Sequence, residues 1–382
     1  MNEMETMALE WNFPSTRYVG SKRRLLPQLW EVFSALEFES ALDLFSGTAS
    51  VSYLFKRMGK RVIANDYLWS NYWTAVGLVE NDTVTLSQAD IGTVLGGTNS
   101  SPASKFVAAM FPGLYFTDAE NVWLDSCRQG IDELGHVYPE EVGRLKRALA
   151  FHALFQSALR KRPFNMFHRR NLYLRLADVS REFGNATTWE RSFGEHFREM
   201  VTEVNALIFS NGLVHEVHRR DALGSDTLPQ SDLVYLDPPY VWRGASSSEV
   251  DYLPKYHFLE GLARYQEWPD LIDKNSPILQ IRDGYQTWPG GSVAQRRKLL
   301  NIYETLVQRY RDRTIVVSYR EPGLPSIEEI TSILRRFKMR VYKASWPYRY
   351  ALRKPQPSTA QPTEVVLIGL NGIYKGPGDQ VG

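Results

Sequence analysis

The first part of the chain alternates between apolar runs of strand length and a segment of helical periodicity. Residues 41–45 form a short apolar run followed by Ser-Gly-Thr, as expected for a strand that ends in a tight turn. Residues 49–58 then repeat apolar side chains at helical spacing, and residues 61–65 form a second apolar run. Strand, helix and strand in this order are typical of parallel pairing, so we expect an α/β fold on a parallel sheet.

The rest of the chain divides into two regions of different pattern. Residues 85–204 contain a long helical segment, residues 143–162, which the following proline would end. Strand-like apolar runs then return at residues 232–236, 314–319, 340–346 and 363–370. The simplest architecture is one α/β domain made of residues 1–84 and 205–382, into which the mostly helical residues 85–204 are inserted.

Composition excludes several classes of protein. The 382 residues include 45 basic and 43 acidic side chains, so bulk charge cannot hold the chain to nucleic acid or membrane. Cys127 is the single cysteine, which excludes an internal disulfide and a multi-cysteine zinc cluster. Residues 1–10 lack the layout of a signal peptide, and no apolar stretch approaches the roughly 18 residues of a membrane helix. We expect a cytoplasmic protein with no membrane contact and no metal site.

The turn after the first expected strand has the position of a nucleoside-cofactor site. It begins at Phe45, and Gly47 within it allows close backbone approach to a ligand. Asp66 follows Phe45 by 21 residues, the spacing expected of an acid that binds ribose hydroxyls. A single glycine is a poor cradle for a pyrophosphate, so the pattern favours a ribose cofactor without phosphate, S-adenosylmethionine. An ordinary strand-turn-helix with an exposed acid would give the same local pattern.

A second chemical signal, Asp237-Pro238-Pro239-Tyr240, directly follows the expected strand at 232–236. The exocyclic amine of a base is a weak nucleophile, because its lone pair is delocalised into the ring. The Asp237 carboxylate and the Pro238 carbonyl can accept the two N–H bonds, and the prolines stiffen the turn. Tyr240 can stack on the base, which must first be flipped out of a duplex. The tetrapeptide therefore predicts methylation of a base amino group.

These two signals together resemble the N6-adenine DNA methyltransferases typified by the DNA adenine methylase (Dam-like) family. Residues 17–23 are similar to the family's Trp-Ala-Gly-Gly-Lys element, which lies over the methionine part of the cofactor. Asp221 resembles the acid of an Asp-Phe element that reaches the cofactor's adenine, although the Phe is missing. Residues 317–321 are similar to a Ser-Tyr-Asn segment in which Arg320 replaces Asn. The cofactor loop precedes the catalytic turn, which is the order of the family's alpha group.

The resemblance implies a Rossmann-like, S-adenosylmethionine-dependent methyltransferase sheet with a mostly helical target-recognition insertion. Residues 1–84 would carry the cofactor loop, 85–204 the insertion and 205–382 the catalytic turn. Catalysis is assigned to Asp237, Pro238 and Tyr240. The resemblance assigns cofactor binding to a set of seven residues: Tyr18, Lys22, Phe45, Gly47, Asp66, Asp221 and Asp237.

The segment from residue 160 to 175 in the insertion is rich in basic side chains and lacks acids. Aromatic residues are interleaved with the basic ones, a composition that suits phosphate contacts and base stacking. Arg and Asn side chains also read purines in the major groove. The predicted DNA contacts are Arg160, Lys161, Arg162, Arg169, Arg170 and Asn171. A solvated basic helix end and loop would show the same composition.

The leading hypothesis is a site-specific DNA methyltransferase that acts on the N6 amino group of an adenine flipped out of double-stranded DNA. A cognate restriction nuclease would fit as a partner. Methylation of cytosine N4 stays open, although Asp237 resembles the adenine enzymes more than the Ser common in cytosine ones. Methylation of adenine in RNA stays open too. A non-catalytic DNA-binding subunit is kept open by Ser21 and Arg320, while the long basic insertion argues against a small-molecule or protein substrate.

Overall fold

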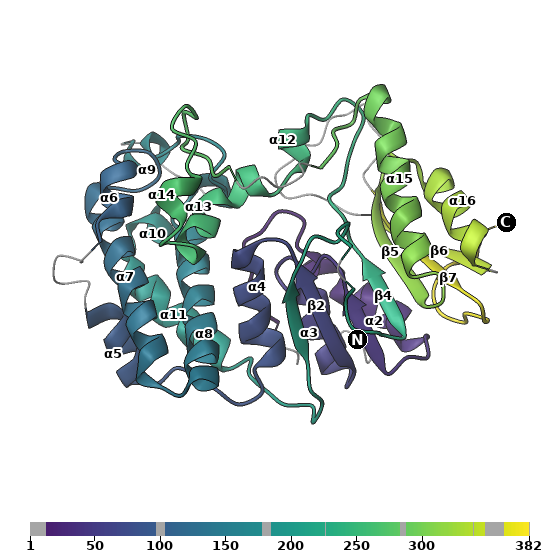
Figure 1. Cartoon of the computed structure of the whole chain (residues 1–382), viewed down its shortest axis with the longest axis horizontal. Helices are drawn as coiled ribbons and strands as arrows, with labels where there is room; N and C mark the ends of the chain where they lie inside the picture. Colours follow the sequence, from purple (N-terminus) through teal and green to yellow (C-terminus); the bar gives the residue numbers. More distant parts are fainter. Residues whose placement is uncertain are drawn as a thin grey trace.

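The computed structural model, shown in Figure 1, describes most of the chain. The N-terminal residues considered above for a signal peptide lie outside the described part. The described residues are 13–96, 104–177, 185–225, 227–282, 288–338, 340–347 and 363–381. Within them, no helix has the length and apolar character needed to cross a membrane.

Eight strands form one sheet in the order β3-β2-β1-β4-β5-β7-β6-β8. The strands from β1 to β5 pair in parallel, whereas β7 runs antiparallel to β5 and to β6. The predicted α/β fold on a parallel sheet is thus confirmed, with an antiparallel edge added. The strands are β1 Ser40–Asp43, β2 Arg61–Asp66, β3 Glu216–Arg219, β4 Leu233–Leu236, β5 Thr314–Glu321, β6 Arg340–Pro347, β7 Thr363–Leu370 and β8 Asp379–Gln380.

Helices cover both faces of the sheet. Successive strand residues point to opposite faces, so the continuous apolar runs leave apolar side chains to be buried on each face. Ala41 packs into one core with α2 (Leu26–Ser34) and α3 (Ser50–Arg57). The next residue, Leu42, packs into a second core with α15 (Val293–Arg309) and α16 (Ile327–Phe337). Strands buried on both faces explain why the sequence shows continuous apolar runs there.

A group of helices packs beside the sheet, on the left in Figure 1. The helix predicted at residues 143–162 is α8, which starts three residues earlier and ends just before the proline. Most members come from the predicted insertion, and two follow the catalytic turn. They are α5 Gln88–Gly96, α6 Phe106–Met110, α7 Asp118–Val137, α8 Glu140–Arg160, α9 Tyr173–Leu176, α10 Asn185–Glu190, α11 Phe193–Asn205, α13 Leu253–Ala263 and α14 Trp268–Leu271.

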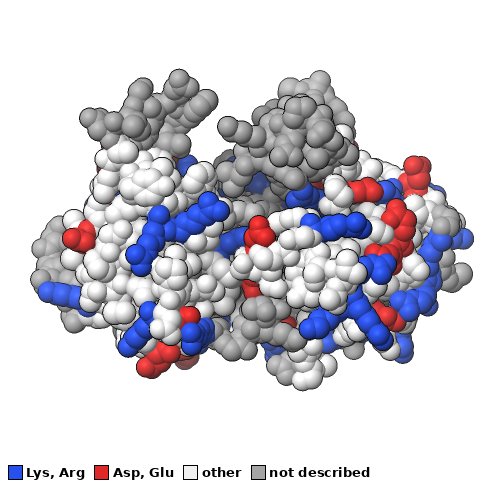
Figure 2. All heavy atoms as spheres, turned by 90° about the horizontal axis from the view of Figure 1, so that it is seen from above, with Lys and Arg blue, Asp and Glu red and all other residues white. Residues whose placement is uncertain are grey.

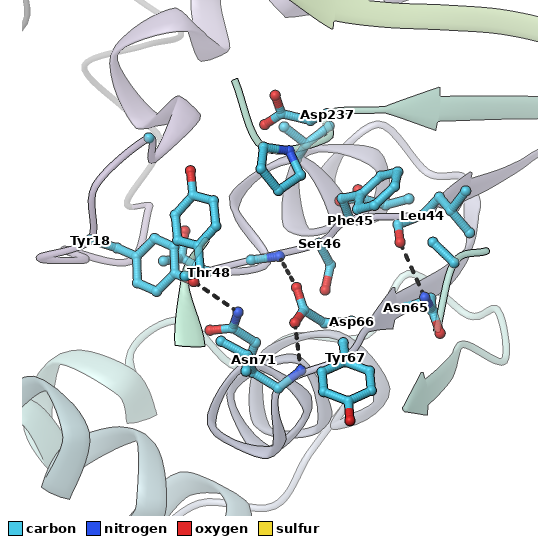
Figure 3. Close-up of a pocket in the computed structure, with 18 of the residues that line it drawn as sticks. Tyr18, Leu44, Phe45, Ser46, Thr48, Asn65, Asp66, Tyr67, Asn71 and Asp237 are labelled. Carbon is cyan, nitrogen blue, oxygen red and sulfur yellow. Dashed lines mark hydrogen bonds between the residues drawn. The ribbon is translucent and has the colours of Figure 1, made fainter. Parts of the chain in front are cut away.

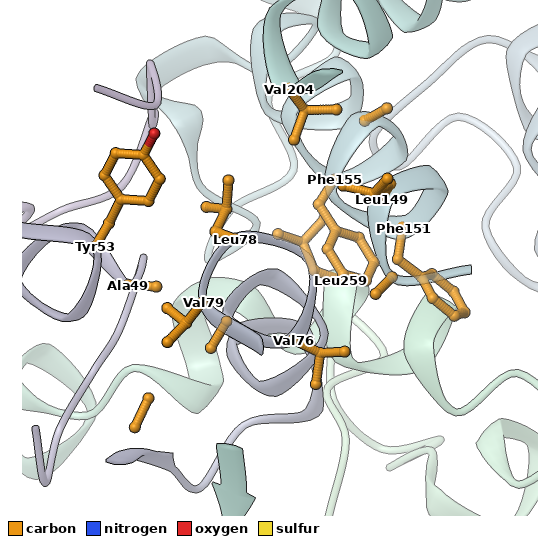
Figure 4. Packing of buried hydrophobic residues seen from close by; sticks show 14 of the residues in the cluster. Ala49, Tyr53, Val76, Leu78, Val79, Leu149, Phe151, Phe155, Val204 and Leu259 are labelled. Atoms are coloured by element: carbon orange, nitrogen blue, oxygen red, sulfur yellow. The ribbon is translucent and has the colours of Figure 1, made fainter. Parts of the chain in front are cut away.

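The helical group and the sheet share one continuous apolar core. Between them lie α4 (Trp69–Ala75) and the helical turn η2 (Val76–Glu80), whose side chains meet α8 (Figure 4). A Cβ at Gly77 would sit 3.4 Å from the Ala148 backbone, so the two helices approach closely there. Trp268 of α14 packs against Phe111, with ring centroids 5.0 Å apart and the rings tilted by 40°. The helical region thus includes residues 253–271 as well as the predicted insertion. The division of the chain into domains at residues 84 and 204 stays a prediction.

Three short elements complete the chain near the carboxyl ends of the parallel strands. They are η1 Lys22–Leu25, η4 Pro163–Asn165 and α12 Ser247–Val250. Strand order reverses between β1 and β4, which are neighbours in the sheet. After β1 the chain continues to β2 on one side of this pair, and after β4 it continues to β5 on the other side. Such a switch point opens a crevice outside the carboxyl ends of the strands, where ligands bind in open α/β sheets.

Candidate active site

The strand register brings the predicted site residues to one edge of the sheet. Asp43 of β1 pairs with Tyr235 of β4. Phe45 and Asp237 lie two residues after these partners, so they reach the same level at the ends of the two strands. Asp66 pairs with the last residue of β3, and Asp221 follows two residues later. A pocket at this edge is shown in Figure 3. Its lining includes all seven residues predicted to bind the cofactor: Tyr18, Lys22, Phe45, Gly47, Asp66, Asp221 and Asp237.

The loop after β1 is tied to the end of β2 by the half-buried carboxylate of Asp66. Gly47 N donates to Asp66 Oδ2 at 2.8 Å, and Leu68 N donates to Asp66 Oδ1 at 2.9 Å. Gly47 has φ +51°, a left-handed conformation that glycine adopts without strain. Burial raises the pKa of Asp66 to about 6. The loop is therefore held open around an acid that can accept further hydrogen bonds from a ligand.

Asn65 fixes the neighbouring backbone. Its side-chain nitrogen donates to the carbonyls of Leu44 and Arg220, both at 3.1 Å, and its side-chain oxygen accepts from Arg220 N at 3.1 Å. These bonds join the ends of three adjacent strands just where their main-chain ladder stops. The pocket floor is thus rigid before any ligand arrives.

Tyr18 forms part of the pocket wall through aromatic stacking. Its ring lies 4.1 Å from that of Tyr256 and 5.4 Å from that of Tyr252, nearly parallel to both. Asn71 Nδ2 donates to the Tyr18 hydroxyl at 3.1 Å (Figure 3). The segment preceding η1 is therefore anchored to α4 and α13, which agrees with a wall that covers a ligand.

Lys22 reaches the catalytic turn. Its ammonium lies 2.7 Å from Asp237 Oδ2 and 4.7 Å from the centre of the Tyr240 ring. Lys22 is only 6% exposed. Burial raises the pKa of Asp237, and the Lys22 charge acts in the opposite direction. Lys22 therefore lines the pocket with the other predicted cofactor residues, while its charge lies at Asp237, the predicted catalytic carboxylate.

The remaining catalytic candidates flank the pocket. From this turn, Asp237 and Pro239 belong to the pocket lining, with Pro238 between them. Tyr240 donates from its hydroxyl to Glu364 Oε2 at 3.1 Å and lies 3.2 Å from Ser318 Oγ. The tyrosine hydroxyl is thus used inside the protein.

Several lining residues were missed by sequence reasoning. Asp43 ends β1 and is 1% exposed, with Ser52 donating to it at 2.7 Å. Ser46 Oγ and Trp288 Nε1 are buried in the lining and make no hydrogen bond to a described residue. Asp43 could have been found as the strand-end acid beside the cofactor loop. Trp288 carries no such signal, because it lies far along the chain outside any motif.

The predicted DNA contacts divide into buried and exposed residues. Arg162 is 1% exposed and donates to the carbonyls of Tyr115 and Arg169, both at 3.0 Å, and also to Asn171 Oδ1. Lys161 is buried and lies 2.9 Å from a Glu120 carboxylate oxygen. The polar groups of Arg162, Lys161 and the buried Asn171 thus bond within the protein around the loop after α8, and their contact with DNA stays a prediction.

The other three predicted DNA contacts differ from one another. Arg160 is partly buried and pairs with Glu199 at 2.7 Å. Arg169 and Arg170 are exposed, and Arg170 Nε donates to the Pro277 carbonyl. The charges available to a partner on this segment are therefore at its tip, and the helix end serves internal packing.

Three carboxyls whose pKa is raised contribute to the pH dependence of the free protein's stability. Burial raises the pKa of Asp43 to about 7, that of Asp66 to about 6 and that of Glu260 to about 7. Each binds its proton more tightly when folded than when unfolded. Their stabilising contribution is fully present below about pH 4 and is lost as pH rises through 6 to 7, on the order of 2–4 kcal/mol for a fully buried group.

Buried histidines act in the opposite direction: burial lowers the pKa of His152 and of His215 to about 4, so their contribution to stability increases as pH rises toward 6.5. The carboxyl contribution is therefore measured as a difference, by urea unfolding of the wild type and of Asp43→Asn at fixed ionic strength. Asp43→Asn cannot ionise at this position, so its stability relative to that of the wild type is expected to increase between pH 5 and pH 8. A difference that stays constant over this range would show that Asp43 does not contribute to the pH dependence.

The structure combines an open α/β sheet with one pocket that both the predicted cofactor loop and the Asp-Pro-Pro-Tyr turn line. This combination is typical of methyltransferases that act on amino groups. The profile described as D12 class N6 adenine-specific DNA methyltransferase matches residues 18–267, well over half of the chain. The chain belongs to this family. It is a site-specific adenine DNA methyltransferase, which confirms the leading hypothesis and leaves the cytosine and non-catalytic alternatives without support. Its reaction uses a methyl donor and a DNA substrate.

Three curated relatives illustrate the likeness. Type II methyltransferase M2.HphI of Haemophilus parahaemolyticus is 26% identical over 88% of this chain and 92% of the relative. Modification methylase StsI of Streptococcus sanguinis is 26% identical over 85% of this chain and 46% of the relative. Type II methyltransferase M.FokI of Planomicrobium okeanokoites is 26% identical over 87% of this chain and 49% of the relative. The chain thus spans nearly all of the first relative and about half of the other two.

Proposed function

We propose that this chain takes the methyl group from S-adenosylmethionine and transfers it to an adenine flipped out of duplex DNA. The observation that carries the proposal is the shared pocket. The loop after β1, the acid after β2 and the Asp237 turn after β4 all line it. A donor held by the first two therefore lies beside the third without any rearrangement of the sheet.

The chemistry of the lining fits this cofactor. Five aspartates line the pocket: Asp43, Asp66, Asp221, Asp237 and Asp251. Those that are ionised would repel a phosphate and attract a cation, and S-adenosylmethionine supplies a methyl group on a positively charged sulfur. Asp66 would hold the ribose hydroxyls, while Phe45 and Trp288, whose ring centroids are 6.0 Å apart, offer an apolar wall for an adenine ring. Ser46 Oγ and Trp288 Nε1 supply unused hydrogen-bonding groups.

The residues of the catalytic turn have separable tasks toward the target base. Lys22 opposes the pKa increase of Asp237 and so favours the carboxylate form, which can accept an N–H bond from the amine. The Pro238 carbonyl accepts the second N–H bond, which directs the nitrogen lone pair toward the methyl group. Tyr240 presents its ring to the base, because its hydroxyl is bonded on the protein side.

For the DNA surface we propose the exposed tip of residues 164–170. Figure 2 shows Lys and Arg side chains on both halves of the face seen from above. Arg169 and Arg170 are exposed, and Phe164 is 53% exposed. Asn165 accepts from Arg17 Nη1 at 3.5 Å, next to the Tyr18 wall of the pocket. The tip therefore lies beside the entrance through which a base must pass, as expected if residues 85–204 serve target recognition.

We expect Arg169→Ala with Arg170→Ala to weaken DNA binding about equally for all sequences. The slope of log affinity against log salt should fall by about 2, because roughly 0.9 counterions are released per phosphate contact. Fluorescence anisotropy with a labelled duplex over a salt series measures this. Arg311→Ala, an exposed arginine beside the exposed Asp312, is the matched control. An unchanged salt slope would remove the tip from the DNA surface.

Titration calorimetry with S-adenosylmethionine, in parallel with methyl transfer to duplex DNA, single-stranded DNA and structured RNA, tests the proposed function. Binding of the cofactor and preference for the duplex are expected. Transfer to RNA instead would keep the cofactor and replace the substrate. The absence of cofactor binding in a folded protein would overturn the proposal.

A modification role is the finer proposal, drawn from the relatives' printed names. DNA methylated by this chain would then resist one nuclease of the same cell. Digestion of methylated and unmethylated DNA with extracts of that cell tests it. Equal cutting of both would count against a cognate restriction nuclease.

A further inference from the structure

Glu364 is a buried acid in an otherwise apolar strand. It lies on β7, where six successive residues are buried, and is 3% exposed. A carboxylate is rarely buried to this extent without a specific partner, because the loss of hydration is costly. A valine or leucine at this position would suit the strand better, so a role beyond packing is expected.

The partner of Glu364 is the tyrosine of the catalytic turn. The Tyr240 hydroxyl donates to Glu364 Oε2 at 3.1 Å, and Ser318 Oγ lies 3.2 Å from the same hydroxyl. The Tyr319 ring meets the Tyr240 ring edge-on, with centroids 5.5 Å apart. Lys22 lies over the ring at 4.7 Å. The ring of Tyr240 is thus fixed at its tip, along one edge and over one face.

Among the described contacts, the bond to Tyr240 links Glu364 to the catalytic turn. It is not one of the residues that line the pocket, and it lies beyond the part of the chain that matches the family profile. On the neighbouring strand β5, Arg320 is its direct register partner. Arg320 is also the residue that departs from the Ser-Tyr-Asn segment. Opposite charges on residues directly across a sheet stabilise the pair. The presence of Arg320 in place of Asn is therefore compatible with the acid Glu364 opposite it.

We propose that Glu364 is a positioning residue for methyl transfer. With Ser318, it sets the angle of the Tyr240 ring and hence the plane in which the target adenine is stacked. The inference rests on the proposed stacking of the base on Tyr240. A misplacement of about 1 Å in such a contact can cost about 100-fold in rate, so a remote bond to a ring tip can matter.

The test is a double-mutant cycle of Glu364→Ala and Tyr240→Phe, with Glu364→Gln as the conservative variant. Each single change is expected to lower kcat about 10- to 100-fold, and the pair no further than the stronger single change. Cofactor affinity should change less than about threefold. Glu364→Gln retains a carbonyl acceptor for the tyrosine hydroxyl and is expected to recover most of the rate. Fluorescence of 2-aminopurine at the target position reports stacking directly and should rise in Glu364→Ala.

Asp125→Asn is the matched control, because Asp125 is also a buried carboxylate bonded by a tyrosine hydroxyl, that of Tyr265, away from the pocket. It is expected to lower the melting temperature and leave kcat unchanged. Additive effects of Glu364→Ala and Tyr240→Phe, or a loss of stability in Glu364→Ala with kcat unchanged, would overturn the proposal. Failure of the wild type to methylate DNA would instead strike the proposed function, so the two failures are distinguishable.

Discussion

Replacing Asp237 by alanine is expected to lower the rate of methyl transfer by about 1000-fold or more, the largest effect of any change considered. In the proposed mechanism the carboxylate is the acceptor that orients the target amine, and the removal of one preorganised polar group at a reacting centre typically costs a factor of 100 to 1000. The change also leaves Lys22, which lies 2.7 Å from Asp237, buried without that partner. Single-turnover transfer with saturating cofactor and duplex measures the effect.

Asp237→Asn separates orientation from charge. Its amide oxygen can still accept one N–H bond, so it is expected to keep more activity than the alanine variant. Duplex binding by either variant should stay within a few-fold of wild type, because the proposed DNA surface lies elsewhere. If the Asp237→Ala enzyme retains more than a tenth of the wild-type rate, the proposed role of Asp237 as the acceptor for the target amine is contradicted.

The second large effect is expected at Asp66. Its carboxylate holds Gly47 N at 2.8 Å and Leu68 N at 2.9 Å, and it is the acid proposed to bind the ribose. Asp66→Ala removes the acceptor and releases the loop. We expect about 100-fold weaker binding of S-adenosylmethionine, corresponding to about 2.7 kcal/mol, as for one or two lost bonds to a charged group.

Asp221→Ala provides the matched comparison for Asp66. Asp221 also lines the pocket, but it is only half-buried and accepts from its own neighbour, Leu223 N, at 2.9 Å. Its loss is expected to weaken the cofactor less than tenfold in the same calorimetric titration. If the two variants bind the cofactor equally well, the ribose role of Asp66 is wrong.

Much of the fold could be predicted, because it depends on local patterns. The apolar runs became strands within one or two residues of their expected ends, since β1, β2, β4, β5 and β7 are buried on both faces. The parallel pairing of β1 with β2 followed from strand-helix-strand alternation, whereas the order of the eight strands was not predicted. By contrast, β3 and β8 were missed, because four residues with one buried side chain, or two exposed ones, give no apolar pattern.

The site was predictable where chemistry lies in contiguous residues, as in the turn at Asp237. It was not predictable where the contact is made across the sheet. Glu364 meets Tyr240 from a strand more than a hundred residues later, and no spacing rule connects them. The burial of Arg162 was unpredictable for a similar reason: composition shows a charge, but only the packing shows that the Tyr115 carbonyl accepts a hydrogen bond from it.

The most direct measurement is transfer of labelled methyl groups from S-adenosylmethionine to genomic DNA that lacks adenine methylation, followed by mass spectrometry of the nucleosides and mapping by sequencing. N6-methyladenine at one recurring sequence is the predicted result, with none formed by Asp237→Ala. Methylated cytosine, or no transfer to DNA by a protein that binds the cofactor, would contradict the central claim.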